Sequence, residues 1–576
     1  MERRVILVIF LSFLTLYVWQ ALFVKPVPKP VAGATAPAAA AGTPAAGEGG
    51  TTSSAVPVSQ AAPSQPTAEA VLGETSERDV QVETADVVAV FTNKGARLKS
   101  WRLKHYLDHN GQPQELVESP IGAQALPFSL RTSDNGVNSA VNAALFVVSG
   151  APPVGTVTST PTVVRFEYRD NSGLHAVKEF QLDGSSYVLT FRASLTVGDR
   201  DLPTAVVWGP ALGDRADVTR ATQPAEALVF ENGSPVRLSA SDIAKQSTRE
   251  GNFRYAGVDD NYFLTAAVGP GASKVTFEPI TIPPAAGSTT AARALISYAI
   301  ERQSTDPLKF FIGPKDLEIL NATDRDLGSA INFGRFALIV VPLLSSLKWV
   351  HGYVGNWGWS IVILTMMISA LLSPLSHKQV VSMRKMQELQ PEIKAIQDRY
   401  SKLKATDPAK QKMNTEMMAL YREKKVNPAG GCIPMLLTFP VLFAMWAMLQ
   451  TSIELRGAPW FGWIHDLSTF DPYYVLPVLM TATSFWQTKM TPAAGADPAQ
   501  QKMMAFMPLV MGFIFVRLPA GALIYYVVSN VWRIGQQYLT NYLIGPPVVR
   551  HVRPAAERRV KRVGGGKTDA ASREEE

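Results

Sequence analysis

Residues Trp357–Leu375 read WGWSIVILTMMISALLSPL, an apolar stretch without a charged side chain. A helix of this length is about 28 Å long, close to the roughly 30 Å hydrocarbon core of a bilayer. The stretch therefore predicts a membrane-spanning helix over residues 356–375. Four further apolar runs follow it and predict spans over residues 431–451, 473–490, 503–516 and 521–543.

A sixth apolar run lies at the N-terminus. Val5–Val24 follows the basic pair Arg3-Arg4 and is stopped by Lys25-Pro26. It is longer than the roughly 7–15 apolar residues of a secretory signal peptide. The pattern predicts an uncleaved signal-anchor helix over residues 1–24, and the alternative is cleavage in the alanine-rich stretch that follows. Residues 25–78 are rich in Ala, Pro, Gly, Thr and Ser, and we expect a flexible linker there.

Residues 79–325 have a different pattern, in which short alternating runs end at turn signals. Val87–Phe91 ends at Asn93-Lys94-Gly95, and Lys178–Leu182 ends at Asp183-Gly184. This pattern is typical of an all-β sandwich. It contains no metal-ligand spacing, nucleophile elbow or Gly-rich phosphate loop, so no cofactor is expected. Residues 330–352 form a shorter, interrupted apolar run that favours an amphipathic helix lying at the membrane interface rather than a span.

The basic residues predict the orientation of the chain. Residues 376–430 carry 12 Lys and Arg, residues 452–472 carry only Arg456, and the tail over residues 544–576 carries eight. The positive-inside rule therefore predicts that both termini are cytoplasmic, together with the loops 376–430 and 491–502. It predicts that the β-domain is periplasmic, together with the loop 452–472. The fold class expected is thus an α-helical polytopic inner-membrane protein with six spans and a periplasmic β-sandwich.

The cytoplasmic segment 376–430 has a helical pattern. Its apolar residues repeat in a heptad seam formed by Met386, Leu389, Ile393, Ile396, Tyr400 and Leu403. Met413, Met417 and Leu420 continue the pattern beyond the break at Asp407-Pro408. The segment therefore predicts a two-helix antiparallel hairpin, which Pro391 kinks or interrupts. A solvated hairpin explains most of its charges, and docking of a partner is the alternative.

Several motifs in the C-terminal region resemble one family. They are Val354-Gly355-Asn356-Trp357-Gly358-Trp359-Ser360, Asn427-Pro428-Ala429-Gly430-Gly431, Trp463-Ile464-His465-Asp466-Leu467-Ser468, Gln501-Lys502-Met503-Met504 and Tyr525-Tyr526-Val527-Val528-Ser529-Asn530. These motifs resemble the YidC membrane-protein insertases, and the resemblance covers residues 330–545 in order. The β-region is similar to the periplasmic domain of that family through Lys178-Glu179-Phe180 and Asp260-Asn261-Tyr262-Phe263.

The resemblance implies a function and partners. Members insert and fold nascent membrane proteins, alone or with the Sec translocon, without nucleotide hydrolysis. Their five core helices enclose a hydrophilic groove that is open to the cytoplasm and to lipid but closed on the outside. The partners implied are nascent membrane proteins, the Sec translocon, the lipid bilayer and a ribosome contacted through the hairpin and the basic tail. DNA is not expected, because the +7 net charge lies beside apolar segments and not in a nucleic-acid groove.

The resemblance also suggests site residues. Thr365 and Tyr526 match groove-lining polar positions. Substrate-contacting helices carry Thr438, Phe439, Pro440, Gln487, Pro508 and Ile514. Alternatively, Thr438 satisfies a backbone carbonyl and Phe439 faces lipid.

One position departs from the family pattern. Members carry a positive charge four residues after the position of Thr365, where this chain has Ser369. Arg533 lies 12 residues after Gly521, the start of the last predicted span. Ser369 lies 12 residues after Trp357, the start of the first core span, so the two residues are predicted to lie at similar depths in the membrane. We hypothesise that Arg533 supplies the groove charge, and the alternative is that it extends toward the cytoplasmic surface.

An ion-coupled transporter and a membrane-anchored sensor are alternative classes of protein. An ion-coupled secondary transporter is expected to carry acidic residues in its spans, and the four runs between Trp357 and Val516 contain no Asp or Glu. A membrane-anchored sensor needs a cytoplasmic output domain, and the longest internal segment is only a hairpin. A membrane-anchored scaffold is a further alternative. No nucleophile, base and orienting group can be placed together, so an enzyme is not expected.

Overall fold

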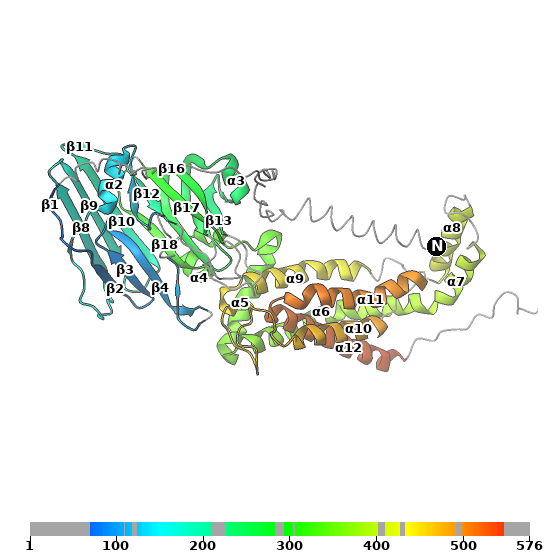
Figure 1. Ribbon diagram of the computed structural model, residues 1–576. Helices are drawn as coiled ribbons and strands as arrows, with labels where there is room; N and C mark the ends of the chain where they lie inside the picture. Colours follow the sequence, from blue (N-terminus) through cyan, green and yellow to red (C-terminus); the bar gives the residue numbers. More distant parts are fainter. Residues whose placement is uncertain are drawn as a thin grey trace, which may run out of the picture. The chain divides into compact units, whose positions relative to one another are not determined.

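The computed structural model describes residues 69–108, 110–117, 124–209, 225–282, 293–302, 304, 306–400, 409–424, 426, 432–490 and 498–545 (Figure 1). The chain divides into two compact units, Met1–Asn332 and Phe333–Glu576. The predicted signal anchor and basic tail lie outside the described residues.

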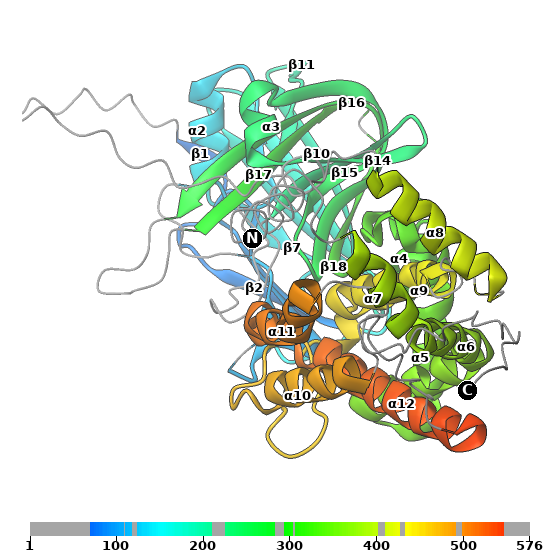
Figure 2. The same cartoon turned by 90° about the vertical axis from the view of Figure 1, so that its right-hand side faces the viewer.

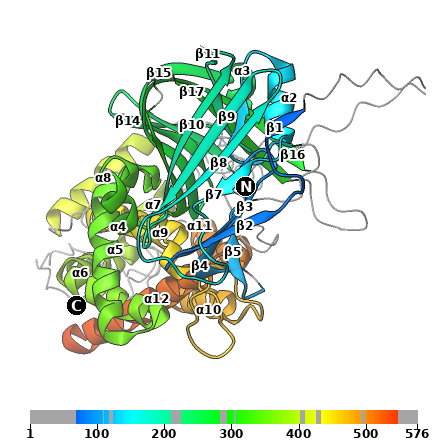
Figure 3. The ribbon, with the colours of Figure 1, turned by 90° about the vertical axis from the view of Figure 1, so that its left-hand side faces the viewer.

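The first unit is built around two antiparallel β-sheets. The larger has the strand order β1-β8-β9-β10-β18-β16-β15-β13-β14, and β6, β7, β11, β12 and β17 pair beside this path. The smaller has the order β2-β3-β4-β5. Figure 3 shows β8, β9 and β10 side by side in the larger sheet.

The strands have the following bounds: β1 Ala70–Leu72, β2 Asp79–Glu83, β3 Val87–Thr92, β4 Arg97–Leu107, β5 Pro113–Glu115, β6 Ser129–Arg131, β7 Val147–Ser149, β8 Thr162–Asp170, β9 Leu174–Leu182, β10 Val188–Val197, β11 Arg200–Asp201, β12 Ala205–Trp208, β13 Glu226–Glu231, β14 Ser234–Leu238, β15 Thr248–Asp259, β16 Phe263–Ile282, β17 Arg293–Arg302 and β18 Leu308–Pro314.

Aromatic side chains form the core between the two sheets. Phe91 of the smaller sheet lies 4.6 Å, centroid to centroid, from Phe180 of the larger one. Phe128 makes further ring contacts with Phe180 at 5.2 Å and with Trp208 at 5.4 Å. Phe91, Phe180 and Trp208 lie in strands, whose successive side chains point to opposite faces, and Phe128 lies in the turn before β6. The predicted β-rich domain is confirmed.

Two details of the β-domain prediction are wrong. The domain is not all-β, because it contains the short helices α2 (Asn135–Ala143), α3 (Ala240–Lys245) and α4 (Leu317–Thr323). Strand β1 lies inside the stretch that we expected to be linker, and it pairs with β8. The composition of a short edge strand is too ordinary to reveal a pairing with residues about 100 positions away.

A fully buried lysine connects three parts of this domain. Lys178 of β9 is 0% exposed, and its Nζ donates to the carbonyls of Gly95 at 2.6 Å and Phe128 at 2.8 Å. Burial, with a smaller effect of Arg97, lowers the pKa of Lys178 well below its usual value. The hydrogen bonds satisfy carbonyl groups that would otherwise be buried without partners.

The second unit is helical. Its elements are η2 Gly334–Phe336, α5 Ala337–Val354, α6 Trp357–Glu388, α7 Gln390–Arg399, α8 Ala409–Glu423, α9 Cys432–Thr451, η4 Ile453–Leu455, α10 Val475–Met490, α11 Pro498–Ile514, η5 Phe515–Arg517 and α12 Ala520–Ile544. The 3-10 segment η1 (Leu327–Ala330) ends the first unit. α5 contacts α6 and α9 and runs across them rather than along them (Figure 1).

Two helices of the described chain are long and apolar enough to cross a membrane, Gly334–Val354 and Trp357–Met386. Phe439–Thr451 and Met503–Arg517 are shorter apolar helices. The helix Gly334–Val354 has 21 residues, so length alone does not distinguish it from a span, and the interfacial helix expected over residues 330–352 stays a prediction. The number of spans therefore stays a prediction.

Helix α6 continues beyond the predicted end of its span at residue 375. It runs without a break to Glu388, although Pro374 lies inside it, and α7 begins at Gln390 with Pro391 in its first turn. The first helix of the predicted hairpin is therefore partly an extension of α6, and the predicted interruption at Pro391 is confirmed. Leu389, Ile393 and Tyr421 form a buried cluster flanked by Met386, Met417 and Leu420, so the predicted seam between the helices is present. Leu403 lies outside the described residues.

Candidate functional site

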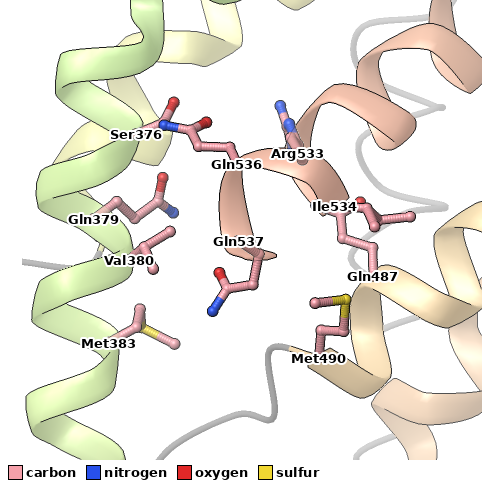
Figure 4. A pocket seen from close by; sticks show the side chains of 10 residues that line it. All are labelled: Ser376, Gln379, Val380, Met383, Gln487, Met490, Arg533, Ile534, Gln536 and Gln537. Carbon is pink, nitrogen blue, oxygen red and sulfur yellow. The ribbon is translucent and has the colours of Figure 1, made fainter. Parts of the chain in front are cut away.

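Three helices enclose a polar cavity of about 190 Å³ in the helical unit (Figure 4). Its lining is supplied by Ser376, Gln379, Val380 and Met383 of α6, Gln487 and Met490 of α10, and Arg533, Ile534, Gln536 and Gln537 of α12. The spacing of these residues explains their convergence, because positions three and four apart share one face of a helix.

The described lining of this cavity combines four glutamine amides, one serine and one guanidinium, and includes no carboxylate. The Arg533 side chain is exposed on the helical unit and forms no ion pair with a described residue. In Figure 4 its guanidinium lies at the level of Ser376, away from the end marked by Met383 and Met490. The cavity is therefore a positively charged, hydrogen-bonding site on an otherwise apolar bundle.

Polar contacts hold the helices around this cavity. Gln536 Nε2 donates to the carbonyl of Ser373 at 2.9 Å, which joins α12 to α6. Asn530 Nδ2 donates to Ser484 Oγ at 2.8 Å, which joins α12 to α10. His377 Nδ1 lies 3.3 Å from Thr540 Oγ1 nearer the end of α12. These contacts position α12 between α6 and α10.

Aromatic rings lie nearer the beginning of α12. Tyr526 is within 5.8 Å of Phe515 and within 6.4 Å of Trp446, measured between ring centroids. Trp446 and Phe515 are 6.1 Å apart. Tyr526 precedes Arg533 by seven residues, so the rings lie about 10 Å from it along the helix axis.

The structure brings two of the predicted site residues, Gln487 and Arg533, to the same cavity. Tyr526 lies instead beside the rings of Phe515 and Trp446. Thr365 is 1% exposed, and its hydroxyl donates to the carbonyl of Ile361 in its own helix at 2.6 Å. Ser369 is partly buried, and its carbonyl accepts from Ser373 Oγ.

The remaining predicted residues lie on α9 and α11. Phe439 and Pro440 are partly buried, and Phe439 stacks on Phe443 at 6.1 Å. Pro508 is buried, and Ile514 is 57% exposed. The backbone of Thr438 belongs to α9, but its side chain lies outside the described part.

The sequence analysis missed the other polar residues of the cavity. Gln536 and Gln537 follow Arg533 by three and four residues, and Gln379 follows Ser376 by three. Polar residues that recur at helical spacing near the end of an apolar run indicate a polar face on that helix, and this was the signal in the sequence for the cavity. Which helices would bring them together could not be read from that spacing.

The fold and the cavity define a membrane protein in which a helical core is joined to a β-rich domain. The model of the 60Kd inner membrane protein family matches residues 349–545, and that of the YidC periplasmic domain matches residues 79–346. The chain therefore belongs to the YidC family of membrane protein insertases, which are inner-membrane proteins with a periplasmic domain and are not enzymes.

Relatives match over nearly the whole chain. A membrane protein insertase YidC of Pelobacter propionicus is 34% identical over 573 residues, covering 94% of this chain and 100% of the relative. Another, of Geobacter metallireducens, is 34% identical over 556 residues and covers 94% and 98%. A crystal structure described as an active YidC insertase with its first transmembrane domain resolved is 19% identical, covers 82% and 95%, and has a TM-score of 0.34.

Proposed function

We propose that this insertase receives the polar segments of nascent membrane proteins in the cavity between α6, α10 and α12. The observation that carries the proposal is the lining itself, in which glutamines and Arg533 converge within an apolar bundle. A polar segment that crosses the hydrocarbon core unaided loses its hydrogen bonds to water, which costs several kcal/mol per group. A cavity with water and amides partway through the membrane shortens that crossing.

The apolar part of a substrate needs a different surface. Large apolar side chains on α11 are exposed: Met504, Phe506, Met507, Leu509, Val510, Phe513 and Ile514. Phe443 of α9 is also 49% exposed. We propose that a substrate helix leaves the cavity along these two helices, where flexible Met side chains adapt to different sequences.

The proposed topology has six spans with both termini in the cytoplasm. α6, α9, α10, α11 and α12 supply five spans, and the predicted N-terminal anchor supplies the sixth. Exposed aromatic residues near one set of helix ends fit a membrane interface there, because Trp and Tyr concentrate at both membrane interfaces: Trp349, Tyr353, Trp359 and Tyr473. The orientation itself rests on the distribution of Lys and Arg among the loops. The 16 residues of α10 make about 24 Å of helix, so the bilayer is thinner there.

Arg533 is the proposed groove cation of this chain, in place of the charge that the family carries at the position of Ser369. Its guanidinium lies in the polar cavity, and no described residue neutralises it. An unneutralised cation in a region of reduced dielectric attracts carboxylates more strongly than one in bulk water. We therefore propose that acidic residues in the translocated segments of substrates pass Arg533.

The proposed insertase function also implies partners. We propose that nascent membrane proteins are the substrates, that the Sec translocon delivers some of them, and that a ribosome contacts the α7–α8 hairpin and the basic tail. The hairpin has a buried seam and carries exposed charges of both signs, such as Glu423 and Lys424.

Photo-crosslinking from defined positions tests the proposed cavity. A photoreactive residue at Gln537 lines the cavity, whereas one at Tyr542 lies on the opposite face of the same helix and is 87% exposed. We expect stalled nascent membrane proteins to crosslink through the polar segment from Gln537 and not from Tyr542. Equal crosslinking of that segment from both positions would show that the cavity is not the entry site.

A further inference from the structure

The ends of α6 and α12 that the proposed topology places in the cytoplasm carry positive charge. Lys378, Arg384 and Lys385 lie in the last part of α6, and α6 contains no Asp or Glu before Glu388. The sequence of α12 contains no acidic residue. The two helices pack along one another (Figure 2). An anion that approaches this end of the helix pair is therefore attracted by the three cations of α6.

These three cations lie at the depth of lipid headgroups. Trp357 begins α6, and tryptophan is typical of the headgroup level of a membrane. Arg384 follows Trp357 by 27 residues, which is about 40 Å of helix. A bilayer is roughly 40–45 Å thick when both headgroup regions are included. Arg384 is thus expected at the headgroup level of the opposite leaflet. Lys378 lies about 9 Å closer to the bilayer centre, and its long side chain reaches toward the same level.

Arg384 has a hydrogen-bond donor that no described residue satisfies. Its side chain is 7% exposed, and its Nη2 donates to the carbonyl of Gly545 at the end of α12. Its Nη1 is buried and has no hydrogen-bond partner in the described part of the chain. Glu388 lies one turn further along α6 and forms no ion pair with Arg384. A buried cationic donor without an acceptor is costly, so the arrangement favours an anionic oxygen at this position.

The lysines lie on the face of α6 that is turned away from the polar cavity. Lys378 and Lys385 are both exposed and are seven residues apart, so they share one face of the helix. That face is about 200° around the helix from Ser376, which lines the cavity. On α12, Leu539 and Leu543 are 57% and 68% exposed, and Leu539 lies about 200° around the helix from Gln537 of the cavity. The outer side of this helix pair thus combines cations at headgroup level with apolar side chains.

We propose that Lys378, Arg384 and Lys385 form a binding site for the headgroup of an anionic phospholipid in the cytoplasmic leaflet. The lysines attract the phosphate, and Arg384 Nη1 donates to one of its oxygens. The acyl chains lie against Leu539 and Leu543. Orientation of the chain by positive charge requires only lysine and arginine in the loops, and it does not explain a guanidinium buried between two helices.

A bound lipid would join the ends of the two helices. The phosphate and the carbonyl of Gly545 then accept from the same guanidinium, so the lipid holds the end of α12 against α6. This inference rests on the proposed topology. It does not depend on the proposed role of the cavity, because the site lies on the other side of the helix pair.

Lipid titration tests the site on the purified protein. The protein in neutral detergent is titrated with phosphatidylglycerol, and bound lipid is counted by native mass spectrometry. Lys378→Gln/Lys385→Gln changes two exposed residues and should weaken binding about fivefold for each lysine, or about 25-fold for the pair. The control Lys394→Gln/Lys412→Gln removes two exposed lysines of α7 and α8 and should bind as the wild type does. Unchanged binding in the first pair, or equal weakening in both pairs, would overturn the proposal.

Two further measurements identify the donor and the ligand. Arg384→Met keeps the bulk of the side chain but removes its donors, and it should weaken phosphatidylglycerol binding at least tenfold, whereas Arg384→Lys should lose less. Wild-type affinity in Arg384→Met would contradict the role of Arg384, and the lysine pair tests the site if that variant does not fold. Phosphatidylcholine and millimolar inorganic phosphate should not displace phosphatidylglycerol. Displacement by inorganic phosphate would assign the site to a soluble phosphate, and displacement by phosphatidylcholine would show that the headgroup charge is not recognised.

Discussion

Replacing Arg533 by alanine is the most direct perturbation of the proposed groove charge. Two opposite unit charges 4 Å apart interact by about 4 kcal/mol at an effective dielectric constant of 20, and by about 1 kcal/mol in water. Arg533 is exposed within a polar cavity, so the lower part of this range applies. We expect Arg533→Ala to cost about 1–2 kcal/mol for each carboxylate that passes, a roughly 5- to 30-fold slower insertion.

The assay uses a pair of substrates that differ only in charge. A single-span protein with two Asp residues in its translocated tail is compared with the same protein carrying Asn at those positions, and insertion into proteoliposomes is followed by protease protection of the tail. Arg533→Ala should slow the Asp substrate and leave the Asn substrate nearly unchanged. Arg533→Lys keeps the charge and should retain most activity.

Two further variants separate a charge effect from a structural one. Ser369→Arg introduced into Arg533→Ala returns a cation to the adjacent helix α6, about 10 Å along that helix from Ser376 of the cavity, and should restore insertion of the Asp substrate. Lys489→Ala removes an exposed cation of α10 that does not line the cavity and should have little effect. Normal insertion of the Asp substrate by Arg533→Ala, or equal loss for both substrates, would refute the relocation of the charge to α12.

Three other outcomes are expected. A cysteine placed within Arg456–Asp466 should be labelled from the periplasmic side and one within Lys402–Lys412 should not, and labelling of both from one side would contradict the six-span topology. Burial lowers the folded-state pKa of Lys178, so the unfolded state binds more protons. The free energy of unfolding should therefore rise with pH up to about 10.4, the unfolded-state pKa, and Lys178→Met should show a smaller slope in thermal unfolding at pH 7–10.5. Gly512→Val should separate α11 from α10 and cost about 1–3 kcal/mol, measured as a lower melting temperature, whereas Gly535→Val, whose Cβ meets no neighbouring atom within 4 Å, should not.

Local patterns predicted much of the architecture. The apolar runs predicted the helices α6, α9, α10, α11 and α12, because an apolar stretch of this length is typical of a helix in a membrane protein. The heptad seam predicted the contact between α7 and α8, since its apolar residues have no other surface to cover. Strand alternation predicted the β-rich domain, but it could not show that β1 pairs with β8, which is a matter of long-range register.

Helix bounds were predicted less well, because composition marks where a membrane ends and not where a helix ends. Residues 376–388 are polar, yet they continue α6 without a break as far as Glu388. Straight-chain residues such as Lys385 and Glu388 favour helix in water as well as in lipid. The predicted span of 20 residues is thus part of a helix of 32.

The candidate site shows the same division between local and long-range information. The sequence by itself determined that Arg533 lies deep in an apolar run, that Ser369 is uncharged, and that polar residues recur at helical spacing in α6 and α12. Only the tertiary structure decided that Gln487 and Arg533 share a cavity while Tyr526 joins the rings of Trp446 and Phe515. The physical reason is that periodicity places a side chain on one face of its helix, whereas the neighbour of that face depends on how the helices pack around each other.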